Sequence, residues 1–273
     1  MLHVLQSICE PGDTRNEDLI WHNDRYAVLL DGSTGLRSTE FDSARFVQEF
    51  ITAFSASTEL GADMCKAIND ALACVARHFS ETYSTAELAY FPSAAGIFVC
   101  EQNDRLEVIS IGDCTAHLIM NNGNVMTVSS DYVSKDKNNV SQFDRAVLDR
   151  MRDIRAKHGV SIREAVQFPE IREMLLQNRQ KMNTDDGYTI LAFNMQPVTE
   201  TAIVSFPKSD VAYIVMHSDG FDQLTKAMTN PHVDLSRVYT ELRKREEEDA
   251  DFNAYPRFKP GDDASAMIIR VDG

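Results

Sequence analysis

Apolar residues in this chain follow two different periods, one after the other along the sequence. Residues 39–55 and 60–83 place apolar side chains three and four positions apart, which predicts two helices that each bury one face. From residue 94 onward, short apolar runs alternate with turn-forming residues, which predicts an antiparallel meander. A further helix is expected at 235–247. The expected strands are residues 2–8, 19–21, 26–31, 95–100, 106–111, 116–120, 125–128, 189–193, 202–206, 211–217 and 264–271.

Residues 131–187 interrupt this meander with charged sequence of helical type. No linker or internal repeat divides the 273 residues, so we expect one domain, 1–273, with a helical insert at about 131–187. The order of helices and strands is typical of an α+β fold with antiparallel sheets. The apolar sides of the insert's two expected helices are expected to dock on the sheet body.

The charge of the insert differs from that of the whole chain. Residues 141–181 hold nine basic and six acidic side chains, whereas the complete chain has a net charge of -15. A positive insert could attract an acidic, phosphorylated partner, and the plain alternative is a solvated helical pair. The strongly acidic total makes nucleic acid and anionic membrane surfaces unexpected partners.

The five cysteines are scattered and form no C-x-x-C pair, which indicates reduced thiols and favours a cytoplasmic location. No signal peptide and no apolar run of membrane-spanning length is evident.

One apolar run, residues 26–30, leads directly into Asp31 and Gly32. By itself, Asp-Gly after a strand favours a hairpin turn. The pattern recurs, however, because Asp113, Asp219 and Asp262 also stand at one end of an apolar run. If these ends converge, they form a cluster of oxygen ligands, and an acidic cluster is usually compensated by divalent cations.

The sequence contains no P-loop, no G-x-G-x-x-G, no nucleophile elbow and no H-E-x-x-H. Five short motifs occur in order along the chain: Asn16-Glu17-Asp18, Asp31-Gly32, Gly112-Asp113, Ser218-Asp219-Gly220 and Asp262-Asp263-x-Ser265. This ordered set resembles the metal-dependent type 2C protein phosphatases, over almost the whole chain. That resemblance implies two antiparallel sheets packed face to face between helices, an α-β-β-α sandwich with a helical flap-like insert.

The same resemblance assigns roles to individual residues. Asp31 is similar to the carboxylate that bridges two metal ions, and Gly32 to the residue that contributes a backbone carbonyl. Asp219 and Asp262 resemble ligands of the first ion, and Glu17 the residue that holds the second, directly or through water. With Asp31, Asp219 and Asp262 as the catalytic residues, a metal-bound water would attack phosphorus. Carboxylates, a carbonyl and water are the ligands that Mg²⁺ and Mn²⁺ prefer.

The resemblance assigns roles to four further residues, two of which depart from the usual spacing. Asp18 is expected to orient the ligands without binding metal. Asp113 and Asp222 resemble the ligands of a third ion, although Asp222 follows Asp219 by three residues where four is usual. Arg15 is expected to bind the substrate phosphate, although it precedes Glu17 by two residues where many members have four.

The expected activity is hydrolysis of phosphoserine or phosphothreonine in proteins, with two Mn²⁺ or Mg²⁺ ions per chain and a third at Asp113 and Asp222. The expected partner is a phosphoprotein of a kinase-linked pathway. Two alternatives stay open: a catalytically weak, phosphoprotein-binding regulatory module on the same fold, and a phosphatase of small phosphoesters.

Overall fold

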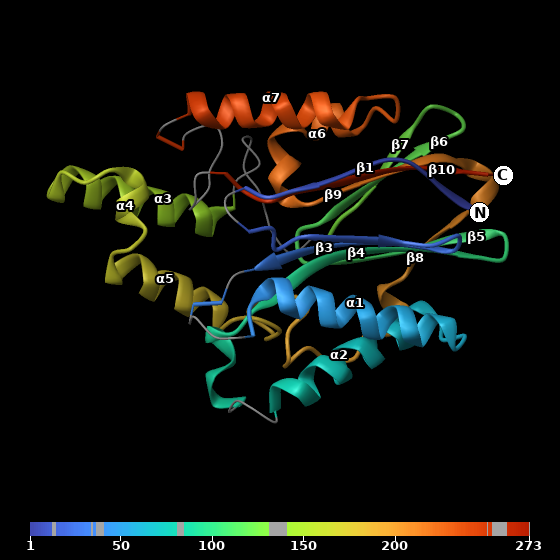
Figure 1. Ribbon diagram of the computed structural model, residues 1–273, viewed down its shortest axis with the longest axis horizontal. Coiled ribbons are helices and arrows are strands. Elements are labelled where there is room, and N and C mark those ends of the chain that lie inside the picture. Colours follow the sequence, from blue (N-terminus) through green and yellow to red (C-terminus); the bar gives the residue numbers. More distant parts are fainter. Residues whose placement is uncertain are drawn as a thin grey trace.

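The computed structural model describes residues 1–12, 15–33, 35–36, 41–80, 85–130, 141–249, 251–252 and 261–272. In this part of the chain, ten strands form two five-stranded antiparallel sheets that lie face to face (Figure 1). The strands are β1 (Leu2–Glu10), β2 (Leu19–His22), β3 (Tyr26–Ser33), β4 (Ser93–Gln102), β5 (Arg105–Ile111), β6 (Thr115–Met120), β7 (Val125–Val128), β8 (Val204–Pro207), β9 (Val211–His217) and β10 (Ala264–Val271).

The first sheet has the strand order β1-β10-β9-β6-β7, and the second has the order β2-β3-β4-β5-β8. Helices cover the outer face of each sheet, so the sandwich has four layers (Figure 1). On the first sheet these are α6 (Thr225–Met228) and α7 (Leu235–Glu248). On the second sheet they are α1 (Ser43–Glu59) and α2 (Met64–Ser80). The predicted α+β sandwich is therefore confirmed.

The alternation of side chains along β3 builds two of these layers at once. Ala27 and Leu29 pack in the apolar cluster between the sheets. Val28 and Leu30 pack against α1 and α2 on the opposite face. Asp31 follows the phase of Ala27 and Leu29, so β3 directs its carboxylate toward the first sheet.

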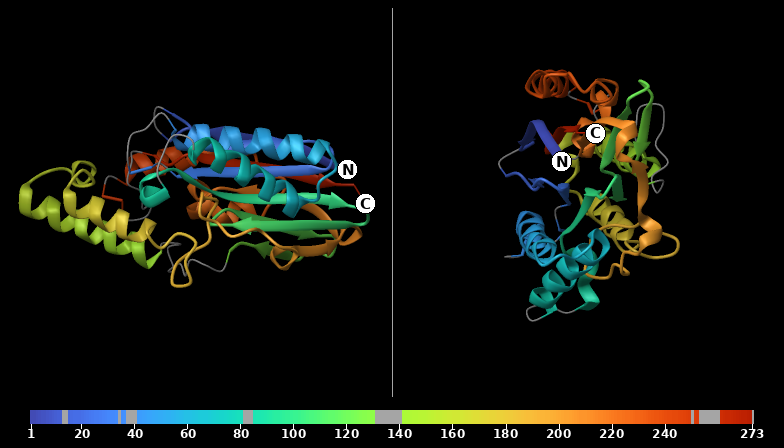
Figure 2. Two further views of the ribbon diagram at one scale, coloured as in Figure 1. Left: turned by 90° about the horizontal axis from the view of Figure 1, so that it is seen from below. Right: turned by 90° about the vertical axis from the view of Figure 1, so that its right-hand side faces the viewer.

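The insert forms a separate helical unit that projects from one end of the sandwich (Figure 2). It consists of α3 (Gln142–His158), α4 (Ile162–Ala165) and α5 (Pro169–Arg179). Its buried side chains, among them Val147, Met151 and Ile171, form their own cluster, which Phe252 completes from the segment after α7. The expectation that these apolar faces dock on the sheet body is wrong, because the three helices bury them against one another. Residues 131–140 of the predicted insert lie outside the described residues.

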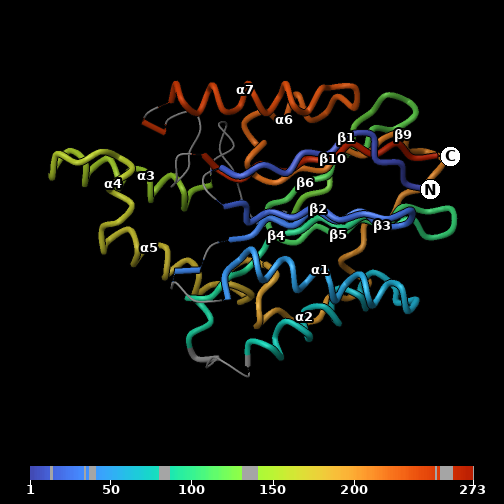
Figure 3. Tube along the Cα trace, viewed as in Figure 1, coloured from blue at the N-terminus to red at the C-terminus, as the bar shows by residue number. Residues whose placement is uncertain are grey.

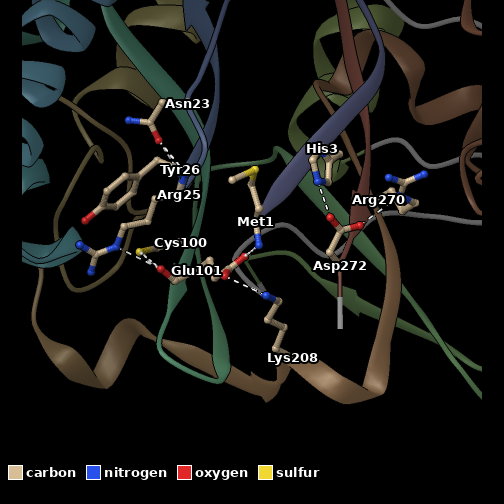
Figure 4. Close-up of polar contacts among 10 residues, drawn as sticks. All are labelled: Met1, His3, Asn23, Arg25, Tyr26, Cys100, Glu101, Lys208, Arg270 and Asp272. Carbon is tan, nitrogen blue, oxygen red and sulfur yellow. Dashed lines mark hydrogen bonds and ion pairs between the residues drawn. The ribbon is translucent and has the colours of Figure 1, made fainter.

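At the other end of the sandwich, a group of charged residues joins the two sheets (Figure 4). Glu101 of β4 accepts ion pairs from the Met1 ammonium at 2.5 Å and from Lys208 Nζ at 2.8 Å. The Arg25 Nε also donates to the Glu101 carbonyl at 3.0 Å. Both described ends of the chain lie at this end, far from the insert (Figure 1).

The predicted strand at 189–193 is wrong, because only Leu191 pairs there, in an isolated bridge with Ala94. The side chain of Asn183 instead forms hydrogen bonds with the backbone groups of Ile190. Its Nδ2 donates to the Ile190 carbonyl at 3.0 Å, and its Oδ1 accepts from the Ile190 N–H at 2.9 Å.

Two simpler expectations can be compared directly with the structure. All five cysteines are free thiols. Among the residues that the structure describes, no helix has the length and apolar character needed to cross a membrane.

Candidate metal centre

The strand register brings the strand ends next to the predicted acidic residues to one end of the sandwich. The insert projects from this end (Figure 3). In the first sheet, Thr115 and Ala266 both pair with His217, so that β6 and β10 begin where β9 ends. In the second sheet, Gly96 pairs with both Leu30 and Ile111, so that β5 ends level with the residue before Asp31. Asp31, Asp113, Asp219 and Asp262 each lie at or within a few residues of one of these strand ends.

These carboxyl groups are near enough for the charge of one to raise the pKa of another. Burial raises the pKa of Asp31 well above its usual value, and the charges of Asp18, Asp113 and Asp262 raise it further. Burial likewise raises the pKa of Asp219, followed by the charges of Asp31, Asp262, Asp113 and Asp222. A hydrogen bond with Asp219 partly offsets the shift at Asp31.

Asp18 is a buried member of this group, with only 7% of its surface exposed to solvent. Neither carboxylate oxygen has a hydrogen-bond partner within the described chain. Burial raises its pKa from 3.8 to about 8, and neighbouring carboxylates, led by Asp263, add to the shift. The Ser265 hydroxyl is near enough to oppose the shift in part, although no hydrogen bond of normal geometry joins the two groups. An orphaned buried carboxylate among other carboxylates is the environment that a cation would stabilise.

The donor set therefore fits Mn²⁺ or Mg²⁺ in its chemistry, since both ions prefer oxygen ligands. The side chains do not stand in a coordinating arrangement. Among the described residues, no three His, Cys, Asp or Glu side chains are grouped to hold a metal ion. The backbone gathers the carboxylates, while coordination would need their side chains to turn toward a common point.

Glycines allow the strand-end segments to pass close to one another. A Cβ added at Gly32 would lie 2.2 Å from the Glu17 carbonyl oxygen, and one at Gly220 would lie 2.1 Å from the Asp263 carbonyl oxygen. Such distances exclude any side chain at either position. Asp31-Gly32 is not a hairpin turn, because β3 continues through it and stays paired with β4 as far as Ser33.

Glu17 and Arg15 lie at the edge of the acidic group. The Ser43 hydroxyl donates to the carboxylate of Glu17. Among the carboxylates that raise the pKa of Asp31, Asp18 and not Glu17 has the largest effect. The exposed Arg15 forms an ion pair with Asp42, the N-cap residue of α1. Of the two predicted ligands of a third ion, Asp113 acts electrostatically on Asp31 and Asp219, and Asp222 on Asp219.

Two residues near this group had no predicted role in the site, although Asp263 lies in one of the motifs. The Asp263 carboxylate, 3% exposed, accepts from the Gly12 N–H at 2.7 Å and from the Glu17 N–H at 2.8 Å, which ties two loops together. Arg179, at the end of α5, is 8% exposed and donates to the Ser33 Oγ at 2.7 Å. Burial lowers its pKa, and the charges of Tyr188 and Glu17 oppose that shift. Arg179 thus connects the insert to the strand that carries Asp31.

Comparison with known proteins places the fold. No protein-family model and no curated protein matches the sequence. Among solved structures, the PPM Ser-Thr phosphatase MsPP from Mycobacterium smegmatis, in complex with cacodylate, is 14% identical with a TM-score of 0.54, over 99% of this chain and 100% of that one. The catalytic domain of the phosphatase PstP, in complex with two manganese ions, is 14% identical with a TM-score of 0.56, over 100% of both chains.

The Ser/Thr phosphatase Stp1 from Staphylococcus aureus is similar to the same degree, at 12% identity and a TM-score of 0.54, over 98% of this chain and 94% of that one. The chain therefore has the fold of the PPM Ser/Thr phosphatases, and the fold that its motifs imply is confirmed.

Proposed function

We propose that this chain hydrolyses phosphoserine or phosphothreonine in proteins, with Mn²⁺ or Mg²⁺ ions held at the aligned strand ends. The observation that supports this most strongly is the group of buried carboxylates whose charges raise one another's pKa values, Asp18, Asp31 and Asp219. The fold is that of Ser/Thr phosphatases, and PstP in that group holds two manganese ions. A divalent cation would remove the repulsion among these groups.

In this proposal Asp31 would bind two ions, the Gly32 carbonyl would bind one of them, and Asp219 and Asp262 would complete the first site. Glu17 would hold the second ion, directly or through water, and Asp18 would orient these ligands from its buried position. Asp113 and Asp222 would hold a third ion. When bound, the ions supply a water of lowered pKa and positive charge for the phosphoryl oxygens.

The other residues of the site hold these ligands in place. Asp263 fixes the backbone of Glu17, and Arg179 fixes the end of β3 two residues after Asp31. Placing ligands by backbone contacts limits the rearrangement that ion binding requires, which favours tight binding. Because Arg15 is engaged with Asp42, binding of the substrate phosphate by Arg15 requires that this ion pair open.

The decisive experiment measures hydrolysis of phosphopeptides and of an aryl phosphate with Mn²⁺, with Mg²⁺ and with chelator. Wild type is compared with Asp31→Asn and with Asp24→Asn, a control at an exposed turn. We expect turnover that chelation abolishes, that Asp31→Asn lacks and that Asp24→Asn retains. Hydrolysis that survives chelation would contradict the proposal.

Two other outcomes would identify the alternatives. Tight binding of phosphopeptide without turnover would identify a regulatory binding module. Turnover confined to small phosphoesters would identify a phosphatase of a different substrate class.

A further inference from the structure

Arg243 of α7 reaches from the outer helical layer to the backbone of Asp262. Its Nη2 donates to the Asp262 carbonyl at 2.5 Å, and its Nη1 donates to Oε2 of Glu246 at 2.5 Å. The two side chains are only 19% and 6% exposed. Hydrogen bonds from a charged donor are shorter and stronger than neutral ones, and little water competes with them here.

Neighbouring groups fix the direction of this guanidinium. Its central carbon lies 4.8 Å from the centre of the Tyr239 ring. The backbone at Gly261 passes so close that an added Cβ would be 2.7 Å from the Arg243 Nη1 and 3.3 Å from the Glu246 Oε2. A ring, a carboxylate and a peptide carbonyl thus hold the rigid, planar fork that distinguishes arginine from lysine.

The same backbone segment is fixed from its other side by Asp263, whose carboxylate accepts the N–H groups of Gly12 and Glu17. Asp262 therefore lies between an anchor on α7 and an anchor on the loop that leads to Glu17. Partners that orient a metal ligand typically change metal affinity by about 10- to 100-fold when they are removed. Contacts of this kind at the backbone of a ligand should act in the same way.

We propose that Arg243, held by Glu246, is a positioning residue that sets the affinity of the site for its divalent cation by fixing the backbone of Asp262. The inference rests on the proposed function, because it takes Asp262 to be a metal ligand. It adds residues of α7 that no motif of the sequence indicates.

The test replaces Arg243 by Met and by Lys and measures Mn²⁺ binding by calorimetry, with kcat and KM for an aryl phosphate at several Mn²⁺ concentrations. We expect the Kd for Mn²⁺ to rise about 10-fold in Arg243→Met. Turnover should fall at limiting Mn²⁺ and recover at saturating Mn²⁺. Arg243→Lys should lie between Met and wild type, because one ammonium cannot reproduce both arms of the fork.

The matched control is Arg245→Met. Arg245 lies on the same helix, but its Nε pairs with Glu241 at 2.6 Å, and both side chains are 45% exposed. This variant should bind Mn²⁺ within about two-fold of wild type, as expected for an exposed ion pair. Thermal unfolding in chelator separates a metal effect from a general loss of stability.

If Arg243→Met keeps the wild-type Kd for Mn²⁺ in its folded fraction, whatever its melting temperature, Arg243 only anchors α7 and the inference is wrong. Should Arg243→Met not fold, Glu246→Gln removes the charge that holds Arg243, and an unchanged Kd in that variant would refute the inference equally. Failure of the proposed function would look different, because wild type itself would then show no Mn²⁺ binding and no metal-dependent turnover.

Discussion

Asp31 is buried among acidic neighbours that belong to both sheets, since Asp18, Asp113 and Asp262 all raise its pKa. A carboxylate that contacts two ions cannot be replaced by an amide without loss at both sites. We therefore predict that Asp31→Asn loses more Mn²⁺ affinity than Asp219→Asn or Asp262→Asn, and by more than the roughly 100-fold limit typical of outer-sphere changes. Calorimetric titration with Mn²⁺ checks this. Two tightly bound ions in the Asp31→Asn protein would show that Asp31 is not the bridging ligand.

Asp18 gives the metal-free protein a defined dependence on pH. Because burial raises its pKa from 3.8 to about 8, the stability that it contributes is complete below about pH 4 and is lost as the pH rises through about 8. In chelator, the melting temperature should therefore fall between pH 5 and pH 8. At pH 8, Asp18→Asn should have a higher melting temperature than wild type, with a free energy of unfolding up to about 5 kcal/mol larger. At pH 5 the two melting temperatures should be close.

Excess Mn²⁺ should reverse this order, because wild type gains binding energy that a weakened site lacks. A melting temperature of Asp18→Asn below that of wild type at pH 8 in chelator would contradict the assignment of an uncompensated buried carboxylate.

At this scale the sequence predicted acidic residues but not the groups that hold them. Asp31, Asp113 and Asp219 stand beside apolar runs, and that pattern is visible without a structure. Asp263 and Arg179 hold backbone N–H and carbonyl groups of distant segments. Any residue type can offer a backbone group, so the sequence does not show which backbone groups these two side chains contact.

Among the elements, the insert is the one whose packing the sequence misassigned. An amphipathic pattern shows that a helix face is buried, but not which surface buries it. The apolar residues of α3, α4 and α5 pack around Phe252, which is fully buried. Its backbone has a φ of 54°, which is uncommon for a bulky residue. Asp251 pairs with Arg155, and Arg152 donates to the Phe252 carbonyl, so that the segment after α7 holds the insert.

We predict that Phe252→Ala loosens the insert and leaves the sandwich intact. Removing a buried phenylalanine costs about 3–5 kcal/mol. Among the described residues, the cluster that would lose this side chain consists of the insert and this segment. Amide hydrogen exchange should accelerate in residues 142–179 and stay unchanged in β3 and β9. Phe252→Leu, which keeps most of the apolar volume, should lie close to wild type. Unchanged exchange in α3 and α5 would show that Phe252 does not support the insert.

The strands and long helices were more predictable, because their patterns are local. The helical period at 39–55 and 60–83 corresponds to α1 and α2: α1 runs four residues past its predicted end, and α2 begins four residues after its predicted start. Residues 39–40 and 81–83 of the two predictions lie outside the described residues. The false strand at 189–193 arose because a side chain can satisfy backbone groups in place of a ladder. Asn183 does this at Ile190, and an apolar run reads the same in either case.

For the whole molecule, the order of the strands in each sheet lies beyond what periodicity can predict. β1 pairs with β10 from opposite ends of the chain, and no local pattern states which strands become neighbours. The arrangement nevertheless places two groups of charged residues at opposite ends of the sandwich. The carboxylates and the insert share one end of the sandwich, while Glu101, Lys208 and the amino terminus close the other (Figures 1 and 4).

If the chain has the proposed activity, the charge of the insert beside the carboxylates would influence which substrate is bound. Residues 141–181 have three more basic than acidic side chains, nine against six, on a chain with a net charge of -15. Arg152 and Arg155 also hold the Phe252 segment, so their replacement would disturb packing. Arg150 has a side chain that is 42% exposed, and its Nη2 lies 3.6 Å from Oε1 of Glu170. This residue and the exposed Lys157 can be changed with less effect on packing.

We predict that the double variant Arg150→Gln, Lys157→Gln lowers kcat/KM for an acidic phosphoprotein several-fold and leaves an aryl phosphate nearly unaffected. Positive charge near the site attracts a partner that the rest of the acidic surface repels, and salt screens this attraction over about 10 Å at 0.1 M. The rate on phosphoprotein should therefore depend less steeply on ionic strength in the variant than in wild type. Arg237→Gln, Lys244→Gln on the exposed face of α7 makes the same change in net charge and should have no such selectivity. Equal losses on both substrates in the insert variant would mean that the insert supports the fold or the metal centre and does not select the substrate.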